Sequence, residues 1–213
     1  MGKKFFFCSI AFWITFSVFE YYFLTSSLWF FWGFTRLGIS ILLLVYIGIQ
    51  IIRIIRFRKC IKKIWIINLS ILFLLLFFNI NINPLNKLVE NIDWKILYSS
   101  RKSIVEKVIR EEINPNVEWN NVTSRLSFRF PIVSVGGNNI WIDRHEDDTV
   151  SVFFYIVNGF FEWPITVFAF SNNNLVIENI EKHIKNDPQN NWKIKENWYR
   201  LFGRNLDFNT TRQ

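Results

Sequence analysis

The chain has 213 residues, of which 51% are hydrophobic, and 25 Lys and Arg against 17 Asp and Glu give a net charge of +8. The first 83 residues hold nine basic residues and one acidic residue, Glu20, whereas the remainder carries sixteen of each sign. Because the excess positive charge lies among apolar runs and not in the polar part, the composition excludes a nucleic-acid-binding protein. Cys8 and Cys60 both precede Pro84, which excludes a disulfide framework or a cysteine-based zinc site beyond it.

The first apolar run, about residues 5–24, follows Lys3 and Lys4 and is interrupted only by Glu20. A cleaved signal peptide would need small residues at its cleavage site, and Thr25–Ser27 fits that requirement poorly. We therefore expect an uncleaved first transmembrane helix. Either alternative delivers the chain to the outside of the membrane at Leu28.

Two further apolar runs, about residues 30–52 and 64–82, flank a short basic segment, Arg53–Lys63, with six cations and no acid. About 20 apolar residues suffice to cross a ~30 Å hydrocarbon core, and short basic loops stay in the cytoplasm. The sequence thus predicts three transmembrane helices in residues 1–83 of a multi-pass plasma-membrane protein. The N-terminus would be cytoplasmic, and residues 84–213 would form an extracellular domain.

Arg36 and Glu20 would both lie toward the outer face of the membrane. One interpretation is an ion pair inside the membrane that marks a transport pathway. The other, which we favour, is that both long side chains extend to the lipid headgroups.

Residues 84–213 show the periods of an α+β domain, in which a long helix packs on an antiparallel sheet of about five strands. The helix is expected over Leu85–Ile113 with a possible break near Ser99-Ser100. A second helix, Leu175–Lys185, follows a possible N-cap in Ser171–Asn174. Alternating and apolar segments predict strands at Arg125–Phe130, Ile132–Val135, Ile140–Asp143, Val150–Val157, Phe160–Phe170 (interrupted at Pro164) and Trp192–Phe202. Gly136–Asn139 and Asn158-Gly159 predict tight turns between strands.

The residues most suggestive of chemistry form the cluster Asp143–Asp148, with four carboxylates and His145. Its spacing matches neither a calcium loop nor a His-Glu-x-x-His zinc helix, so a charged turn between strands is the favoured interpretation. A hydrolase using Asp143, His145 and Glu146 is the alternative, and a dyad of His145 with Ser134 is open. His183 is expected to be solvated. No catalytic, cofactor-binding or metal-binding residue is assigned.

Four segments beyond Pro84 share their order with a group of known proteins: SSRKSIVEKVI (Ser99–Ile109), FPIVSVGGNNIWI (Phe130–Ile142), VFFYIVNGFFE (Val152–Glu162) and NWYRLF (Asn197–Phe202). In this the chain resembles small membrane proteins of low-G+C Gram-positive bacteria, in which two or three spans precede an outer α+β domain. The resemblance covers about 110 residues. It implies a topology and a location, and it implies no activity.

We therefore predict a non-enzymatic protein of the cell membrane, embedded in the lipid bilayer, whose outer domain binds another membrane or cell-surface protein or a peptide. A sensor, accessory or immunity-type role would fit. The alternatives are the extracytoplasmic hydrolase and an accessory subunit of a transport complex, for which the aromatic-rich spans would form the interface. No cofactor and no nucleic-acid partner are expected.

Overall fold

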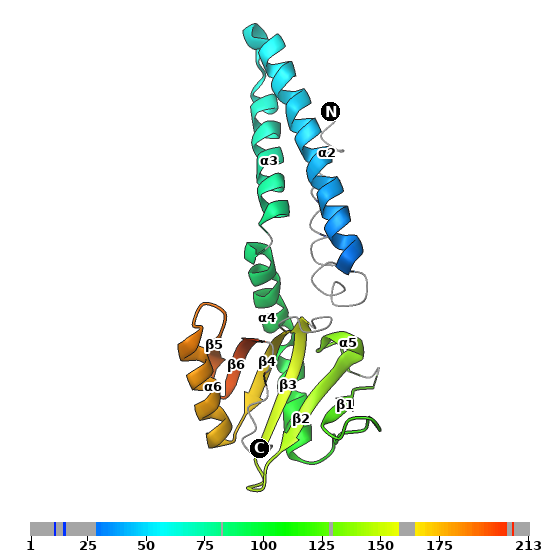
Figure 1. Cartoon of the computed structure of the whole chain (residues 1–213), viewed down its shortest axis with the longest axis vertical. Helices are drawn as coiled ribbons and strands as arrows, with labels where there is room; N and C mark the ends of the chain where they lie inside the picture. Colours follow the sequence, from blue (N-terminus) through cyan, green and yellow to red (C-terminus); the bar gives the residue numbers. More distant parts are fainter. Residues whose placement is uncertain are drawn as a thin grey trace. The chain divides into compact units, whose positions relative to one another are not determined.

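The computed structural model describes residues 29–81, 83–127, 130–157 and 165–203, together with the single positions 11, 15 and 206. The chain divides into two compact units, and Figure 1 labels their helices and strands. One unit is Ser27–Asn91, and the other contains Ile92–Gln213 with Met1–Ser26. The predicted first span, about 5–24, lies outside the described residues apart from positions 11 and 15.

The first unit contains two apolar helices joined by a short turn. Helix α2 spans Trp29–Arg56, the 3-10 turn η1 spans Arg58–Cys60, and helix α3 spans Lys63–Ile80. Both helices are long and apolar enough to cross a membrane, and they confirm the helices predicted at 30–52 and 64–82. At a rise of 1.5 Å per residue, α3 alone is about 27 Å long.

The helices α2 and α3 pack together through a narrow apolar seam. Ile47 of α2 and Leu72 and Leu76 of α3 form its buried centre. Beyond the seam, Nδ2 of the buried Asn79 donates hydrogen bonds to the carbonyl oxygen of Arg36 (3.2 Å) and to Oγ of Ser40 (2.7 Å). One polar contact therefore fixes the register of the two helices, which the apolar seam alone would leave free to slide.

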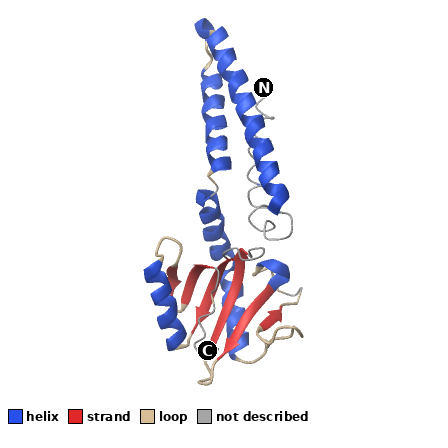
Figure 2. Cartoon of the chain, viewed as in Figure 1, coloured by secondary structure: helices blue, strands red, loops and turns tan. Residues whose placement is uncertain are grey.

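The second unit is built on one six-stranded antiparallel sheet with the order β1-β2-β3-β4-β6-β5 (Figure 2). The sheet confirms the predicted α+β class and has one strand more than the five or so expected. Its strands are β1 (Thr123–Arg125), β2 (Asn139–Arg144), β3 (Val150–Val157), β4 (Ile165–Ser171), β5 (Trp192–Lys195) and β6 (Trp198–Gly203).

Helix α4, Asn83–Ile109, covers one face of this sheet with its part from Ile92 onward. The ring of Trp94 lies 5.0 Å from that of Phe168 in β4 and 5.3 Å from that of Trp198 in β6. Aromatic rings at these distances, edge to face, pack more favourably than their buried area alone would give.

A buried ion pair anchors α4 to the sheet. Nη2 of Arg101 lies 2.6 Å from the Oδ2 of Asp93, and both side chains are only 1% exposed. The same guanidinium donates from Nε (3.1 Å) and Nη2 (3.0 Å) to the carbonyl oxygen of Val133, and it lies 4.9 Å above the ring of Phe168. Helix, loop and strand thus meet at one cation.

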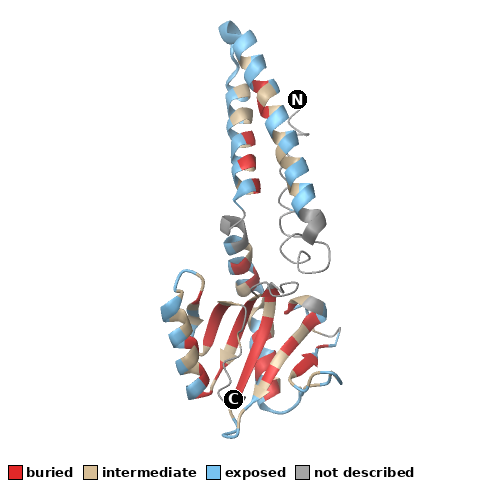
Figure 3. Ribbon diagram, viewed as in Figure 1, coloured by how far each residue is buried: buried red, intermediate tan, exposed pale blue. Residues whose placement is uncertain are grey.

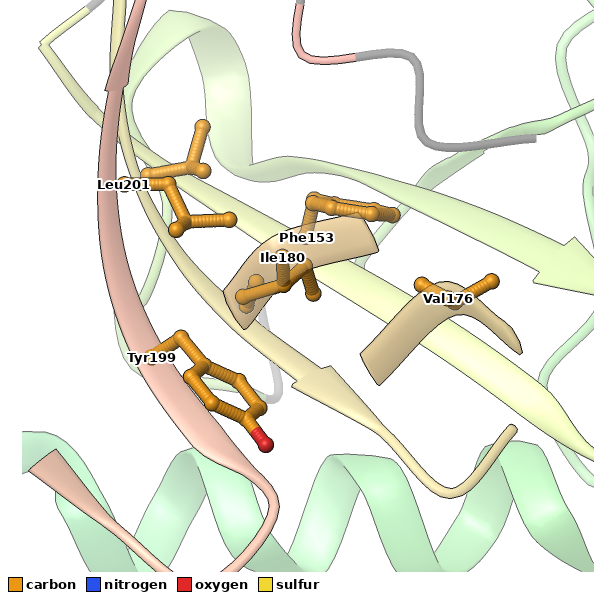
Figure 4. Packing of buried hydrophobic residues seen from close by; sticks show 7 residues of the cluster. Phe153, Val176, Ile180, Tyr199 and Leu201 are labelled. Carbon is orange, nitrogen blue, oxygen red and sulfur yellow. The ribbon is translucent and has the colours of Figure 1, made fainter. Parts of the chain in front are cut away.

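Helix α6, Asn174–Asn186, covers the opposite face. Its Val176 and Ile180 pack with Phe153, Tyr199 and Leu201 of the sheet (Figure 4). Because neighbouring residues of a strand point to opposite faces, Trp198 on the α4 side and Tyr199 on the α6 side place the two helices on the two sides of the sheet.

Two tyrosines on the α6 side of the sheet, Tyr155 and Tyr199, have raised pKa values. Desolvation raises the pKa of Tyr155 to about 12. For Tyr199, desolvation and the negative charge of Glu181 raise the pKa above its ordinary value. Both side chains therefore pack as neutral aromatic residues throughout the physiological pH range.

Helix α4 differs from the prediction at two points. It runs without a break through Ser99-Ser100, and it ends at Ile109, before the predicted end at Ile113. The end is a Schellman motif, in which the amide of Glu112 bonds to the carbonyl of Lys107 and Glu111 takes a positive φ of 62°. The local backbone thus ends the helix before Asn114-Pro115-Asn116 is reached.

The predicted hairpin at Gly136–Asn139 is wrong. Residues Val135–Asn138 form a single helical turn, α5, and β2 pairs with β1 and β3 instead of Ile132–Val135. The cause is Asn138, whose Oδ1 accepts from the amides of Val133 (2.9 Å) and Ser134 (3.2 Å). Its own φ of 62° and the φ of 86° at Gly137 are left-handed, as the Gly-Gly-Asn-Asn signal implies, but they close a loop and not a two-residue hairpin.

Two other strand predictions need correction. Trp192–Phe202 is not one strand but the hairpin β5–β6, which turns at Glu196-Asn197 with φ of 61° at Asn197. The strand predicted at Arg125–Phe130 coincides with β1 only at Arg125, because β1 spans Thr123–Arg125. Positions 128–129 lie outside the described residues. Residues 158–164, with the predicted turn and the segment Phe160–Trp163, also lie outside them.

Truncating Asp93 to alanine should destabilise the second unit by about 3–5 kcal/mol, because the buried guanidinium of Arg101 would lose its countercharge. The matched control is Glu106→Ala, which removes one partner of the exposed Lys102–Glu106 pair at 3.6 Å. That change should cost less than about 1 kcal/mol. Urea denaturation of the full chain in detergent measures both, and equal losses would contradict the anchoring role of the pair.

Candidate functional site

The charged cluster Asp143–Asp148 forms the end of β2 and the turn into β3. Arg144 ties this turn to the end of α4, since its Nη2 donates to the carbonyl oxygen of Val108 (2.8 Å) and to Oδ1 of Asn114 (2.9 Å). Glu146 and Asp148 point to solvent, and Asp143 is half-buried. The carboxylates of the turn therefore differ in their exposure.

Asp147 is held inside the turn by neighbouring donors. It accepts hydrogen bonds from the amide and hydroxyl of Thr149 and from Nδ2 of Asn173, at 3.2 Å and 3.3 Å to its two oxygens. The Thr149 hydroxyl, with Asn173 as a smaller contributor, lowers the pKa of Asp147 below its ordinary value. Within the described ranges, no group of three His, Cys, Asp or Glu side chains is placed to hold a metal ion, and that includes this turn.

The histidine of the cluster takes part in a chain of buried hydroxyls. Nε2 of His145 lies 3.0 Å from Oγ of Ser151, which lies 2.9 Å from Oγ of Ser171. The first distance is that of a nucleophile and its base. However, Ser151, near the start of β3, is 1% exposed, and Ser171, at the end of β4, is 0% exposed, so neither hydroxyl is open to a substrate.

The other residues considered for hydrolysis lie elsewhere. Ser134 Oγ is bonded to the backbone, since it donates to the carbonyl of Asn139 and accepts from the amide of Tyr155 (2.9 Å). The structure therefore does not bring Ser134 to His145. His183 is half-buried and its Nε2 donates to the carbonyl oxygen of Phe202 (3.1 Å), so the expectation of a solvated side chain is wrong.

The surface that does distinguish this protein is that of α2 and α3 (Figure 3). Their large aliphatic side chains outside the seam are exposed, with Leu42 at 70% and Ile52 at 65%. Residues 29–81 contain no Asp or Glu. Apolar contiguous surface of this kind marks contact with lipid or another apolar partner.

The turn between these helices carries the predicted cluster of cations. The six basic residues of Arg53–Lys63 are all exposed. Arg53 and Arg56 are helical, in the last turn of α2, where the negative end of the helix dipole favours them. The guanidinium of Arg53 lies 4.8 Å from the ring centre of Trp65, and Phe57 meets the same ring edge-on at 6.1 Å.

Sequence reasoning missed two of the polar contacts that organise these units. Asn79 occurs at the end of an apolar run, followed by Asn81 and Asn83, and its position at the end of that run was the available signal. The pair Asp93–Arg101 gave none, because eight residues separate the two on one helix and the sequence rules for helical pairs cover spacings of three and four.

No protein family, curated protein or solved structure matches the chain in comparisons with known proteins. The resemblance of its four C-terminal segments to small membrane proteins of Gram-positive bacteria therefore stays a prediction.

Replacing Asn173 by alanine should destabilise the second unit by about 1–2 kcal/mol, because Asn173 accepts the amide of Val176 as the N-cap of α6 and also donates to Asp147 and Thr149. The control Asn174→Ala changes an exposed neighbour and should cost less than about 0.5 kcal/mol. Denaturation at a series of pH values measures both.

The pH series adds a second readout. A carboxylate with a lowered pKa contributes stability above its unfolded pKa and loses it as the pH falls. Since Asn173 is one of the donors that lower the pKa of Asp147, the deficit of Asn173→Ala should be largest near neutral pH and should shrink in acid. A deficit that is independent of pH would assign the whole effect to the cap.

Proposed function

We propose that this chain is an integral protein of the plasma membrane, in which α2 and α3 cross the bilayer and the unit from Ile92 onward is an extracellular, non-enzymatic binding domain. The observation that carries the proposal is the exposed aliphatic surface of α2 and α3. Water solvates such a surface poorly, whereas hydrocarbon solvates it well. Helices are also the structures whose backbone polar groups are satisfied internally in lipid.

The orientation follows from the charges. Six cations at one end of the two helices, without an acid in residues 29–81, are costly to move through lipid, so the turn 57–62 stays in the cytoplasm. The ends of α2 and α3 away from this turn then lie at the outer face. With the predicted first span ahead of them, the N-terminus is cytoplasmic.

A binding role suits the second unit better than catalysis does. The hydroxyl of Ser151, which contacts His145, is buried. By contrast, β5 is the last strand in the order of the sheet, so one side of its backbone pairs with no other strand among the described residues. An extended peptide or the strand of another surface protein can add to such an edge. Trp119, 76% exposed, lies in the loop before β1, at the opposite edge of the sheet, and offers a separate apolar contact.

Cysteine labelling tests the topology. In a chain with Cys8 and Cys60 changed to serine, Glu146→Cys places a thiol in the exposed β2–β3 turn, and a membrane-impermeant maleimide should label it in intact cells. The chain with only Cys8 changed keeps the exposed Cys60. Cys60 should be labelled only after permeabilisation. The reverse pattern would contradict the proposed orientation.

Photocrosslinking tests where partners bind. A photoreactive phenylalanine analogue at Lys193, exposed on β5, should crosslink to a protein or peptide in intact cells, and one at Leu42, exposed on α2, should crosslink mainly to lipid. Protein crosslinks from Leu42 alone would contradict an outer binding domain. They would favour an accessory subunit of a transport complex.

A further inference from the structure

The tip of the α2–α3 hairpin, Arg53–Lys63, concentrates positive charge that no carboxylate among the described residues neutralises. Its basic residues are Arg53, Arg56, Arg58, Lys59, Lys62 and Lys63. All six are exposed, and none forms an ion pair with a carboxylate in the part of the chain that the structure describes. The unit Ser27–Asn91 contains a single acidic residue, Glu90, seven residues beyond the start of α4. The described part of the chain therefore supplies no countercharge to the tip.

The backbone holds these cations in a small volume. The amide of Phe57 bonds to the carbonyl of Arg53 (3.0 Å), that of Cys60 to Phe57 (2.9 Å), and that of Trp65 to Lys62 (2.8 Å). The chain thus reverses through one 3-10 turn between two packed helices. Six like charges at such a tip repel one another, so an anion bound there gains from all of them at once.

Two aromatic rings indicate the level of the tip in a bilayer. The ring of Trp65 contacts both the guanidinium of Arg53 and the ring of Phe57. Tryptophan prefers the boundary between hydrocarbon and headgroups, and a guanidinium stacked on it keeps its N–H edge free for phosphate. The cations beyond Trp65 then lie among the headgroup phosphates.

The start of α3 also favours a bound anion. Lys62 occupies the N-cap position without a side-chain hydrogen bond, and Lys63 follows as the first helical residue. Positive side chains at this end oppose the helix dipole, and no acidic residue occurs in the first turn.

We infer that the tip binds anionic phospholipids, with the phosphodiesters of at least two headgroups engaged by the basic residues of Arg53–Lys63. The site would select a lipid such as phosphatidylglycerol over zwitterionic phosphatidylcholine. The inference rests on the proposed membrane insertion of α2 and α3, and it goes beyond that proposal by assigning a ligand class to the turn.

Spin-labelled lipids test it with the full chain reconstituted in phosphatidylcholine vesicles at low salt. Labelled phosphatidylglycerol should associate with the wild type at least about fivefold more strongly than labelled phosphatidylcholine, since a cation at an anionic surface contributes about that factor. The triple change Lys59→Ala, Lys62→Ala and Lys63→Ala should reduce the ratio severalfold. A ratio near one for the wild type would overturn the inference.

Two matched triple variants separate charge from structure and position. Replacing the same three lysines by arginine keeps the charge and should keep the preference. Changing Lys102, Lys182 and Lys185 to alanine removes the same charge from exposed positions of the second unit and should leave the ratio unchanged. Loss of preference in either variant would contradict a charge-based site at the tip.

Two further measurements distinguish a lipid headgroup from free phosphate as the ligand, and a failure of membrane insertion from a failure of the lipid site alone. Inorganic phosphate at millimolar concentration should not displace the labelled lipid, and displacement would instead indicate a site for free anions. Flotation of the vesicles shows whether the chain is embedded. A wild type that fails to float would overturn the proposed membrane protein, whereas one that floats without lipid preference would overturn the lipid site alone. Because both leaflets carry the label, the readout does not depend on the orientation of the chain.

Discussion

A cation that cannot reach water organises the second unit. Arg101 is enclosed by Asp93, the carbonyl oxygen of Val133 and the ring of Phe168, so its position is set by three separate parts of the chain. Desolvating a guanidinium is costly unless each donor is satisfied. Any shift of α4 along the sheet would break several of these contacts together. The aromatic packing of Trp94 on the same face can therefore adopt one register.

The six basic residues of the hairpin tip differ from Arg101 in where their countercharge lies. Arg101 carries its countercharge within the chain, whereas Arg53–Lys63 has no carboxylate within residues 29–81. Such a tip is stable only where solvent or a binding partner supplies anions. The proposed topology provides them, because the cytoplasmic leaflet of a membrane carries anionic headgroups. The charges thus both determine the orientation and, by our inference, bind the lipid that meets them.

The elements that the sequence predicted well are those whose periodicity is uninterrupted. The long apolar runs, interrupted only by Arg36, gave α2 and α3, and the spacing of Val176 and Ile180 gave α6. The errors arose where a single side chain decides the backbone. The side-chain oxygen of Asn138 closes the loop before β2. Asn197, with its positive φ, reverses the chain between β5 and β6 without a glycine nearby. Such contacts depend on geometry that no local pattern contains.

Some of the candidate functional residues could likewise be predicted from the sequence, and others could not. The cations of the hairpin tip were visible in the sequence, because their meaning depends on charge and spacing alone. The role of Asn79 was not, since its donors reach Arg36 and Ser40 some forty residues away. The cluster Asp143–Asp148 drew attention by composition, yet no three of its described side chains are placed to hold a metal ion. One of its carboxylates is instead held by Thr149 and Asn173.

Aliphatic residues have different surroundings in the helices of the two units. In α6 the apolar positions Val176 and Ile180, with the partly buried Ile177 and Ile184, form one stripe that the sheet covers. In α2 and α3 apolar residues surround each helix, so the seam around Ile47 buries only a fraction of them. A helix that is apolar on every side needs an apolar environment on every side. Since α2 and α3 shield each other along a single seam, the rest of that environment must come from lipid or from another apolar surface.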